Sequence, residues 1–240
     1  TLTARSCSMM KLMEKISLRP NPSTSLRAKK SLGQHFLMHA RIAERIARVA
    51  EFRPDSVALE IGPGTGILTR ELLKRAKKVI AVEADRELCG ELQFNFAREI
   101  AEGRLELICG DVRAFDTAAP PKEYKLVANI PYYLTGEIFR LFLSSDNQPS
   151  SVTLLVQKEV AERVVVRKNK PLDSARGKES ILSLSVKAYG TPKYEFTVPR
   201  GAFRPSPKVD SAVLSIRDIS RKNFRTPAEE KRFFDLIHAG

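Results

Sequence analysis

Residues 56–75 read SVALEIGPGTGILTRELLKR, and this stretch decides the fold. The apolar run at 56–60 predicts a short buried strand that ends in an acid, Glu60. Three glycines crowd into the next few residues, from Gly62 to Gly66, and the apolar pattern of residues 67–75 then predicts a helix. Strand, glycine loop and helix in this order indicate the first unit of an α/β fold.

Further strands and helices alternate after this unit. Strands are expected at residues 79–82, 105–109, 124–128 and 152–156, and helices at about 85–101, 135–143 and 157–166. Alternation at this spacing favours a parallel sheet with helices on both faces. Two later strands, 194–198 and 212–216, would pair as an antiparallel hairpin at the sheet edge, which gives a mostly parallel, seven-stranded α/β sheet.

The segments outside this alternation also have readable patterns. A helix with a basic face leads into the sheet from His39, helices are expected at 179–189 and 227–239, and the polar span 169–178 is expected to be a loop. The main domain is expected at 31–217. Because the last helix has no C-terminal cap, we expect residues 218–240 to be the start of a truncated helical domain.

Residues 1–30 are expected to be a basic, flexible tail. They are rich in Ser, Arg, Lys and Pro and contain a single acid, Glu14. Such a leader also fits an organelle transit peptide. Met9 and Met10 lie inside it, so an extension upstream of a shorter natural start fits equally well.

The glycine loop matches neither of two common phosphate-binding fingerprints. Ile67 stands where the dinucleotide pattern G-x-G-x-x-G needs its third glycine, and the Lys-Ser/Thr pair of a P-loop is absent. Instead, an acid ends each of the first three predicted strands: Glu60, Glu83 and Asp111. Any one of these acids alone would fit a helix cap. Three acids on successive strand ends, together with the loop, favour a ligand.

The positions of these acids indicate what that ligand is. Glu83 lies 21 residues beyond Gly62, at the end of the second strand, where a carboxylate can bind both hydroxyls of a ribose. Asp111 ends the third strand and can accept a hydrogen bond from an adenine amino group. An adenosine that carries an amino acid and a sulfonium would fill this row, with its carboxylate on the amides of the loop around Gly64.

A second polar cluster follows the apolar run 124–128, namely Asn129, Ile130, Pro131 and Tyr132. The Asn129 amide can accept a hydrogen bond, Pro131 leaves a nearby carbonyl free because it has no N–H, and Tyr132 offers a flat face. Two acceptors and a stacking surface suit the exocyclic amine of a flat base, whose delocalised lone pair must be localised before it attacks. Methyl transfer from a sulfonium mainly needs alignment, so no general base is required.

Charge and length narrow the class of partner. The chain of 240 residues has a formal charge of +13. Residues 51–130 carry 12 basic and 14 acidic side chains, whereas residues 1–30 carry 7 and 1 and residues 151–240 carry 18 and 10. Basic segments that flank a near-neutral block indicate a polyanion, which here means nucleic acid. No apolar run reaches about 18 residues, so no membrane-spanning helix is predicted.

The cysteines and histidines indicate no metal site. Cys7, Cys89 and Cys109 show neither close pairing nor C-x-x-C spacing, so we expect neither a disulfide framework nor a zinc site. A reducing compartment follows, and the cytoplasm is expected, with organelle import as the alternative. His35 and His39 lie four residues apart but lack the Glu of H-E-x-x-H.

Taken together, these motifs resemble the ribosomal RNA adenine dimethyltransferases of the KsgA type, over residues 30 to about 217. Residues 31–37 (SLGQHFL) are similar to the opening motif of that family, and residues 60–69 to its cofactor loop. Residues 82–85 and 110–111 are similar to its ribose and adenine contacts, and residues 129–132 to its N-[IL]-P-Y motif. Residues 155–160 are similar to its L-x-Q-K-E-V run, and residues 203–213 to its F-x-P-x-P-K-V-D-S-A-V signature.

The resemblance implies a Rossmann-like class I methyltransferase that uses S-adenosyl-L-methionine and releases S-adenosyl-L-homocysteine. It implies that the cofactor contacts are His35, Leu37, Gly62, Gly64, Glu83, Asp111 and Asn129. Pro131 belongs to the catalytic motif, Tyr132 stacks on a flipped adenine, and Phe203 closes its other face. The implied substrate is a pair of adjacent adenosines near the 3′ end of small-subunit (16S) rRNA, each methylated twice at N6. A monomer that acts on the immature small subunit is expected.

Two other functions share these features. The first is a large-subunit (23S) rRNA adenine N6-methyltransferase of the macrolide-resistance type, against which the signature with Lys208 and Asp210 favours the small-subunit enzyme. The second is a non-catalytic RNA-binding or transcription factor derived from the family. Intact Asn129 and Glu83 speak against it.

Overall fold

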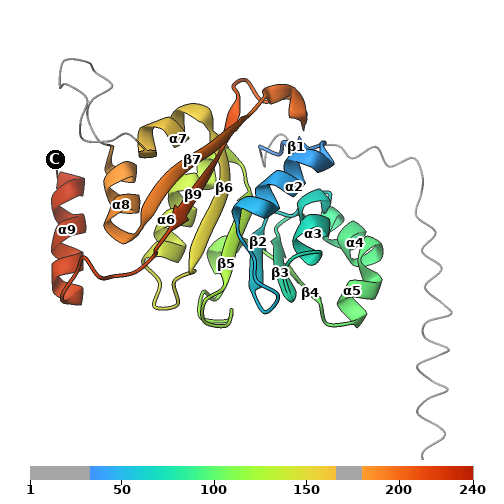
Figure 1. Cartoon of the computed structure of the whole chain (residues 1–240), viewed down its shortest axis with the longest axis horizontal. Helices are drawn as coiled ribbons and strands as arrows, with labels where there is room; N and C mark the ends of the chain where they lie inside the picture. The colour runs from blue at the N-terminus through green and yellow to red at the C-terminus, as the bar shows by residue number, and fades with distance from the viewer. Residues whose placement is uncertain (1–32, 166–179, 240) are drawn as a thin grey trace, which may run out of the picture.

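A computed structural model describes residues 33–165 and 180–239, and its centre is a twisted sheet (Figure 1). The strands of this sheet are β2 (Val57–Ile61), β3 (Lys78–Glu83), β4 (Leu105–Cys109), β5 (Lys125–Asn129), β6 (Ser151–Gln157), β7 (Thr191–Val198) and β9 (Ser211–Arg217). The seven strands lie in the order β4-β3-β2-β5-β6-β9-β7. Neighbours from β4 to β6 pair in parallel, and β9 is antiparallel to β6 and β7. The predicted fold class and edge hairpin are confirmed.

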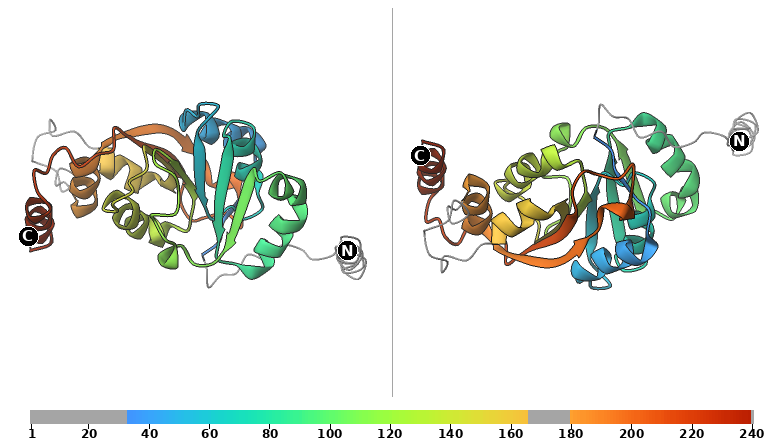
Figure 2. Two further views of the ribbon diagram at one scale, coloured as in Figure 1. Left: turned by 90° about the horizontal axis from the view of Figure 1, so that it is seen from below. Right: turned by 90° about the horizontal axis from the view of Figure 1, so that it is seen from above.

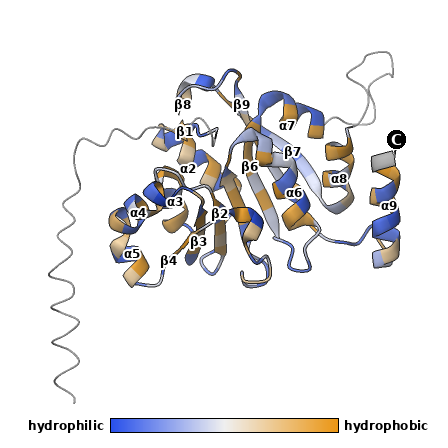
Figure 3. Cartoon of the chain, turned by 180° about the vertical axis from the view of Figure 1, so that it is seen from behind, coloured by the Kyte–Doolittle hydropathy of each residue, from blue (hydrophilic) through white to orange (hydrophobic). Residues whose placement is uncertain are grey.

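Helices cover both faces of the sheet, as predicted (Figure 2). One face carries α2 (Ala40–Val49), α3 (Ile67–Leu73), α4 (Arg86–Asn95) and α5 (Ala97–Ala101), and the other carries α6 (Thr135–Leu143), α7 (Lys158–Val165) and α8 (Ile181–Tyr189). The last helix, α9 (Pro227–Ala239), packs on α8, with the Tyr189 and Phe234 rings stacked 5.7 Å apart. The helices carry mixed polar and apolar residues (Figure 3), and apolar residues of α2, α3, α6 and α7 belong to the two clusters packed on the sheet.

The apolar strands explain why both faces need cover. Leu59 and Ile61 of β2 belong to the hydrophobic cluster on the α6 side, while Ala58, the residue before Leu59, belongs to the cluster on the α3 side. Side chains alternate between the faces of a strand, so a nearly continuous apolar strand is stable only when both faces are covered. The apolar pattern of the strands therefore indicates the helix layers on both faces of the sheet as well as the strands themselves.

One predicted helix is wrong in its extent. The span expected to form a single helix at about 85–101 is two helices, α4 and α5, because the backbone at Phe96 leaves the helical region with φ −120°. Phe96 is 1% exposed and its ring fills the space beside Gly66. The break turns this aromatic ring into the core, which helical periodicity alone did not reveal.

A second, two-stranded sheet was not predicted. It pairs β1 (Phe36–Leu37) with β8 (Phe203–Arg204) in antiparallel register, Leu37 opposite Phe203. Two-residue strands have too few positions for a period to show in the sequence. This small sheet joins the opening motif to the proline-rich signature, at one end of the main sheet (Figure 1).

The expectation that the cysteines are unpaired is also wrong. Cys89 of α4 and Cys109, the last residue of β4, form a disulfide with their Cα atoms 5.9 Å apart. They are 20 residues apart in sequence and become neighbours only because α4 folds back against β4. The sequence spacing could not indicate this contact. The inference of a reducing compartment, which rested on unpaired cysteines, loses its support.

Some predictions are not tested by the described residues. The tail at 1–30 and the loop at 169–178 lie outside them, and the domain boundary near residue 217 stays a prediction. The helix expected at 227–239 is confirmed as α9. In the part of the chain that the structure describes, no helix combines the length and the apolar character needed to cross a bilayer.

Replacing Gly66 tests the packing of the glycine loop. Gly66 has φ +78°, and an added Cβ would lie 2.5 Å from Cε2 of Phe96. We expect Gly66→Ala to lower the free energy of unfolding by about 1–2 kcal/mol for the left-handed backbone and by about 1–3 kcal/mol more for the overpacking. Urea unfolding at fixed pH measures this loss.

Gly90→Ala is the matched control. Gly90 lies inside α4 with no atom within 4 Å of its added Cβ, so alanine should raise stability by about 0.5–1 kcal/mol. Equal effects of the two substitutions would contradict the packing argument.

Candidate cofactor and adenine site

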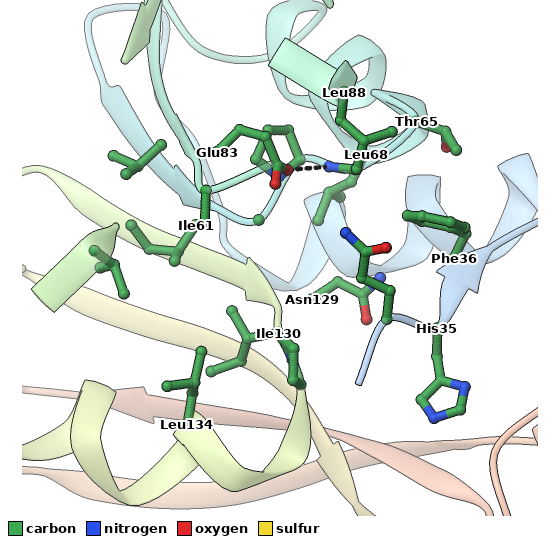
Figure 4. A pocket seen from close by; sticks show the side chains of 18 of the residues that line it. His35, Phe36, Ile61, Thr65, Leu68, Glu83, Leu88, Asn129, Ile130 and Leu134 are labelled. Atoms are coloured by element: carbon green, nitrogen blue, oxygen red, sulfur yellow. Dashed lines mark hydrogen bonds between the residues drawn. The ribbon is translucent and has the colours of Figure 1, made fainter. Parts of the chain in front are cut away.

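A cleft opens at the carboxyl ends of the parallel strands, where ligands of such sheets bind. Its walls come from the glycine loop, from the ends of β3, β4 and β5, and from the segment at β1. The lining includes Gln34, His35, Phe36, Leu37, Gly62, Gly64, Glu83, Leu88, Asp111, Arg113, Asn129, Pro131 and Tyr133. Figure 4 shows labelled side chains from the glycine loop, from the ends of β3 and β5 and from the segment at β1 around one space. All seven predicted cofactor residues and Pro131 therefore meet in one cleft.

The glycine loop closes on the acid that ends β3. The Gly64 N–H donates to Oε2 of Glu83 over 3.0 Å, the bond dashed in Figure 4. Gly62 and Gly64 have φ of +70° and +58°, which glycine adopts without the steric cost of a Cβ. The loop backbone can therefore line the cleft closely, as the sequence predicted.

Glu83 is held in place from two sides. Its Oε1 accepts from the Asp85 N–H over 2.9 Å, while its Oε2 accepts from Gly64. Burial raises the pKa of Glu83 above its usual value, although these backbone donors oppose the shift. A carboxylate has about four acceptor positions, so a ribose hydroxyl can still find a lone pair on each oxygen.

Asp111 is oriented by its own turn and by one arginine. Its Oδ1 accepts from the Arg113 N–H over 2.9 Å, and the Arg113 guanidinium contacts both carboxylate oxygens. The hydrogen bonds from Arg113 lower the pKa of Asp111. Asp111 thus serves as the helix cap that the sequence allowed and also faces the cleft as a charged acceptor.

The Asn129 amide faces the same cleft as Glu83 and Asp111. Asn129 is the last residue of β5, and its side chain makes no hydrogen bond to another described residue. Pro131 follows in an extended conformation, φ −53° and ψ 136°, and begins the short turn Tyr132–Leu134. The amide is therefore available to a ligand rather than used in packing.

Two predicted aromatic residues lie outside this cleft lining. The Tyr132 hydroxyl bonds to Ser211 over 2.7 Å, and its ring stands 6.1 Å from that of His35. Tyr132 is partly buried and is not among the cleft-lining residues, whereas its neighbour Tyr133 lines the cleft. Phe203 is 3% exposed in the hydrophobic core, so the structure does not bring it to the cleft, and its role on the adenine stays a prediction.

Other lining residues were missed as site residues. Gln34 and Phe36 stand inside the opening motif 31–37, so that motif was the available signal. Leu88 and Arg113 carried no signal, because their place depends on how α4 and the turn after β4 pack. Tyr133 stood one residue beyond a motif that named only its neighbour.

Glu60 is the first of the three strand acids, but it lies in the core below the loop. It is 0% exposed, and both of its carboxylate oxygens and the Thr69 hydroxyl lack a hydrogen bond of ordinary geometry. Burial, opposed by the Thr69 hydroxyl and aided by the charge of Glu83, raises the pKa of Glu60 to about 8. At neutral pH the Glu60 carboxyl keeps its proton.

The cleft fits an adenosine with an amino acid side chain. It offers a glycine loop whose backbone lines the cleft, carboxylates at Glu83 and Asp111, and an open amide at Asn129. With the strand order of the sheet, this site defines a class I S-adenosylmethionine-dependent methyltransferase. The chain belongs to the family described as ribosomal RNA adenine dimethylase, whose model matches residues 25–239.

Known relatives agree with this assignment. The chain is 39% identical over 223 residues to ribosomal RNA small subunit methyltransferase A of Dehalococcoides mccartyi, which covers 90% of this chain and 71% of the relative. A dimethyladenosine transferase from Plasmodium falciparum has a similar structure, with TM-score 0.72 and 30% identity over 85% of this chain and 70% of that chain. The 23S rRNA methyltransferase ErmE gives TM-score 0.69 and 30% identity, over 85% and 77%.

The protonated Glu60 predicts a pH-dependent stability. In the unfolded chain this carboxyl loses its proton near pH 4.5, whereas in the folded chain it keeps it up to about pH 8. The folded state binds more protons in this window, so the contribution of Glu60 to stability falls as pH rises through it. We expect Glu60→Gln to remove this fall and to be more favourable, relative to the parent chain, at pH 8 than at pH 5.

Glu71→Gln is the control for that measurement. The pKa of Glu71 is lowered although burial opposes this, because Lys74 and Arg75 donate to its carboxylate. Its stabilising effect is lost only below about pH 4.5. Urea unfolding should therefore show the same cost of Glu71→Gln at pH 5 and pH 8. Parallel pH profiles for Glu60→Gln and the parent would show that Glu60 is ionised in the fold.

Proposed function

We propose that this protein transfers methyl groups from S-adenosylmethionine to N6 of two adjacent adenosines near the 3′ end of small-subunit rRNA, which gives N6,N6-dimethyladenosine. The observation that carries the proposal is the Asn129 amide, which faces the cleft shared with Glu83 and Asp111 and has no partner among the described residues. Acceptors suited to an amine and acceptors suited to an adenosine cofactor thus lie at the same edge of the sheet, with β2 between β3 and β5.

The cofactor residues divide by strand. Glu83 would hold the ribose hydroxyls, Asp111 the adenine amine, and the amides of Gly62 and Gly64 the amino acid end. S-adenosylmethionine, when bound, supplies an electrophilic methyl group on a sulfonium. Leu37 and the neighbouring Phe36 of β1 are buried apolar residues that close the cleft wall and exclude water.

The Asn129 motif would prepare the attacking amine. The Asn129 side-chain oxygen accepts one N6–H, and a carbonyl next to Pro131 accepts the other, which draws the nitrogen lone pair out of the ring system. Tyr132 would hold the ring of the flipped base by stacking. Alignment of the amine with the methyl group supplies the main part of the rate, and the proton leaves to water afterwards.

Small-subunit rRNA is the best supported substrate. The relative from Dehalococcoides mccartyi is named for the small subunit and is 39% identical to this chain, whereas the 23S enzyme ErmE is 30% identical. Three exposed cations, Arg200, Arg204 and Lys208, lie in the loop that contacts His35 through Pro205. They place positive charge near the cleft mouth, which suits the phosphates of an immature small subunit, with the protein acting as a monomer.

Asn129→Ala is expected to abolish methyl transfer. Loss of the acceptor should lower kcat at least about 100-fold, as for loss of other preorganised polar contacts to a reacting group. The affinity for S-adenosylmethionine, measured by calorimetry, should fall only a few-fold. Equal losses of both would make Asn129 a cofactor residue alone. Asn95→Ala, an exposed asparagine at the end of α4, is the control and should leave both values unchanged.

The substrate is tested with labelled cofactor and under-methylated small subunits. Mass spectrometry of the digested rRNA should place N6,N6-dimethyladenosine at two adjacent positions near the 3′ end. Label in 23S rRNA alone would instead support the large-subunit alternative.

Binding to rRNA should weaken steeply with salt, because each phosphate contact releases counterions. Arg204→Ala should reduce the slope of log affinity against log salt by about 1. Arg98→Ala is the control, since this exposed arginine of α5 pairs with Glu102 and lies away from the cleft lining. Filter binding between about 50 and 200 mM salt measures the slope, and a flat response would contradict the basic footprint.

A further inference from the structure

Tyr132 is fixed at its tip by a buried serine. The Tyr132 hydroxyl and Oγ of Ser211 are 2.7 Å apart, and either oxygen can donate. Ser211 is 0% exposed, and its hydroxyl has no other hydrogen-bond partner among the described residues. Alanine would occupy nearly the same volume at this position. The serine hydroxyl therefore has one evident use, which is to hold Tyr132.

The serine itself is held rigidly. It is the first residue of β9, which lies between β6 and β7, and it pairs with Gln157 on one side and Val198 on the other. A residue between two hydrogen-bonded strands has little freedom to move. The tip of Tyr132 is thus attached to the main sheet rather than to a loop.

The flank of the Tyr132 ring is also in contact with an anchored group. The His35 ring lies 6.1 Å from it at an interplanar angle of 24°. His35 is in turn joined to the proline-rich loop, since its Nδ1 lies 2.7 Å from the carbonyl oxygen of Pro205. Ser211, which contacts the Tyr132 hydroxyl, and Pro205, which contacts His35, both belong to the signature 203–213. From the sequence alone, only Phe203 of this signature has an expected chemical role.

We propose that Ser211 is a positioning residue for methyl transfer, because its hydroxyl sets the orientation in which the Tyr132 ring receives the target adenine. This inference rests on the proposed function. Ser211 would set the orientation of the adenine ring, and thereby the direction in which its N6 amine points. Ser211 is 0% exposed, so it reaches neither the base nor the cofactor directly.

Misalignment predicts a particular kinetic signature. An orientation error at the reacting atoms lowers the rate of the chemical step, and an error of about 1 Å can cost about 100-fold. Loss of a single hydrogen bond leaves the ring in place but free to turn, so we expect kcat to fall about 5- to 50-fold. The affinity for S-adenosylmethionine should change less than about twofold, because no cofactor contact is lost.

The test is a double-mutant cycle on kcat with under-methylated small subunits. Ser211→Ala and Tyr132→Phe each remove one partner of the same hydrogen bond and keep the core volume and the ring. Each should lower kcat to a similar extent, and the double variant should be no slower than either. Losses that multiply in the double variant, or a parental kcat in Ser211→Ala, would overturn the proposal.

Ser215→Ala is the matched control on the same strand. Ser215 is 1% exposed, and its hydroxyl donates to Glu195 over 2.7 Å, away from the cleft. It should lose a similar amount of thermal stability but keep the parental kcat. If Ser211→Ala does not fold, Tyr132→Phe removes the same bond from the partly buried side, and a parental kcat in that variant alone overturns the proposal. A parent chain that methylates no small subunit would refute the proposed function, which is a separate outcome.

Discussion

The register of the parallel strands is the constraint on which the site depends. Ile61 of β2 stands opposite Val82 of β3 and Ala128 of β5, so the residues that follow them reach the same edge of the sheet together. Strand β2 lies between β3, which ends in Glu83, and β5, which ends in Asn129. Adjacent strands lie about 4.8 Å apart, so the glycine loop after β2 stands between these two residues. A slip of one residue would turn every side chain of a strand to the other face. The apolar pairing that buries the strands therefore also aims the polar residues at their ends.

The three acids Glu60, Glu83 and Asp111 lie near the same edge of the sheet but differ in burial and in protonation. Glu60 points into the core and keeps its proton, Glu83 is buried but held by two backbone amides, and Asp111 is partly exposed and paired with Arg113. The sequence gives the same residue type at similar places, and the surroundings set the charge. Because burial keeps the Glu60 carboxyl protonated at neutral pH, Glu60 adds no negative charge beneath the glycine loop.

Much of this arrangement could be predicted from sequence, and the rest has a common physical cause. The strand ends and their acids could be predicted because strands buried on both faces are apolar, so a polar residue marks where a strand stops. The features that could not be predicted depend on contacts between segments that are distant in the sequence. Examples are the pairing of Cys89 with Cys109, the core position of Phe203, and the bond from Tyr132 to Ser211. The residue types were visible in each case, but their neighbours were not.

The two-stranded sheet of β1 and β8 has a consequence for how the molecule is made. His35 and Pro205, which meet beside this sheet, are 170 residues apart. Elements from β2 to β5 are contiguous in the chain and can associate early. The pairing of β1 with β8 needs nearly all of the described sequence to be present, and such non-local contacts form late. During synthesis, the strands from β2 to β5 can therefore assemble before β1 and β8 pair. The side of the cleft formed by β1 stays open until residue 204 has been added, so the cleft is complete only late in folding.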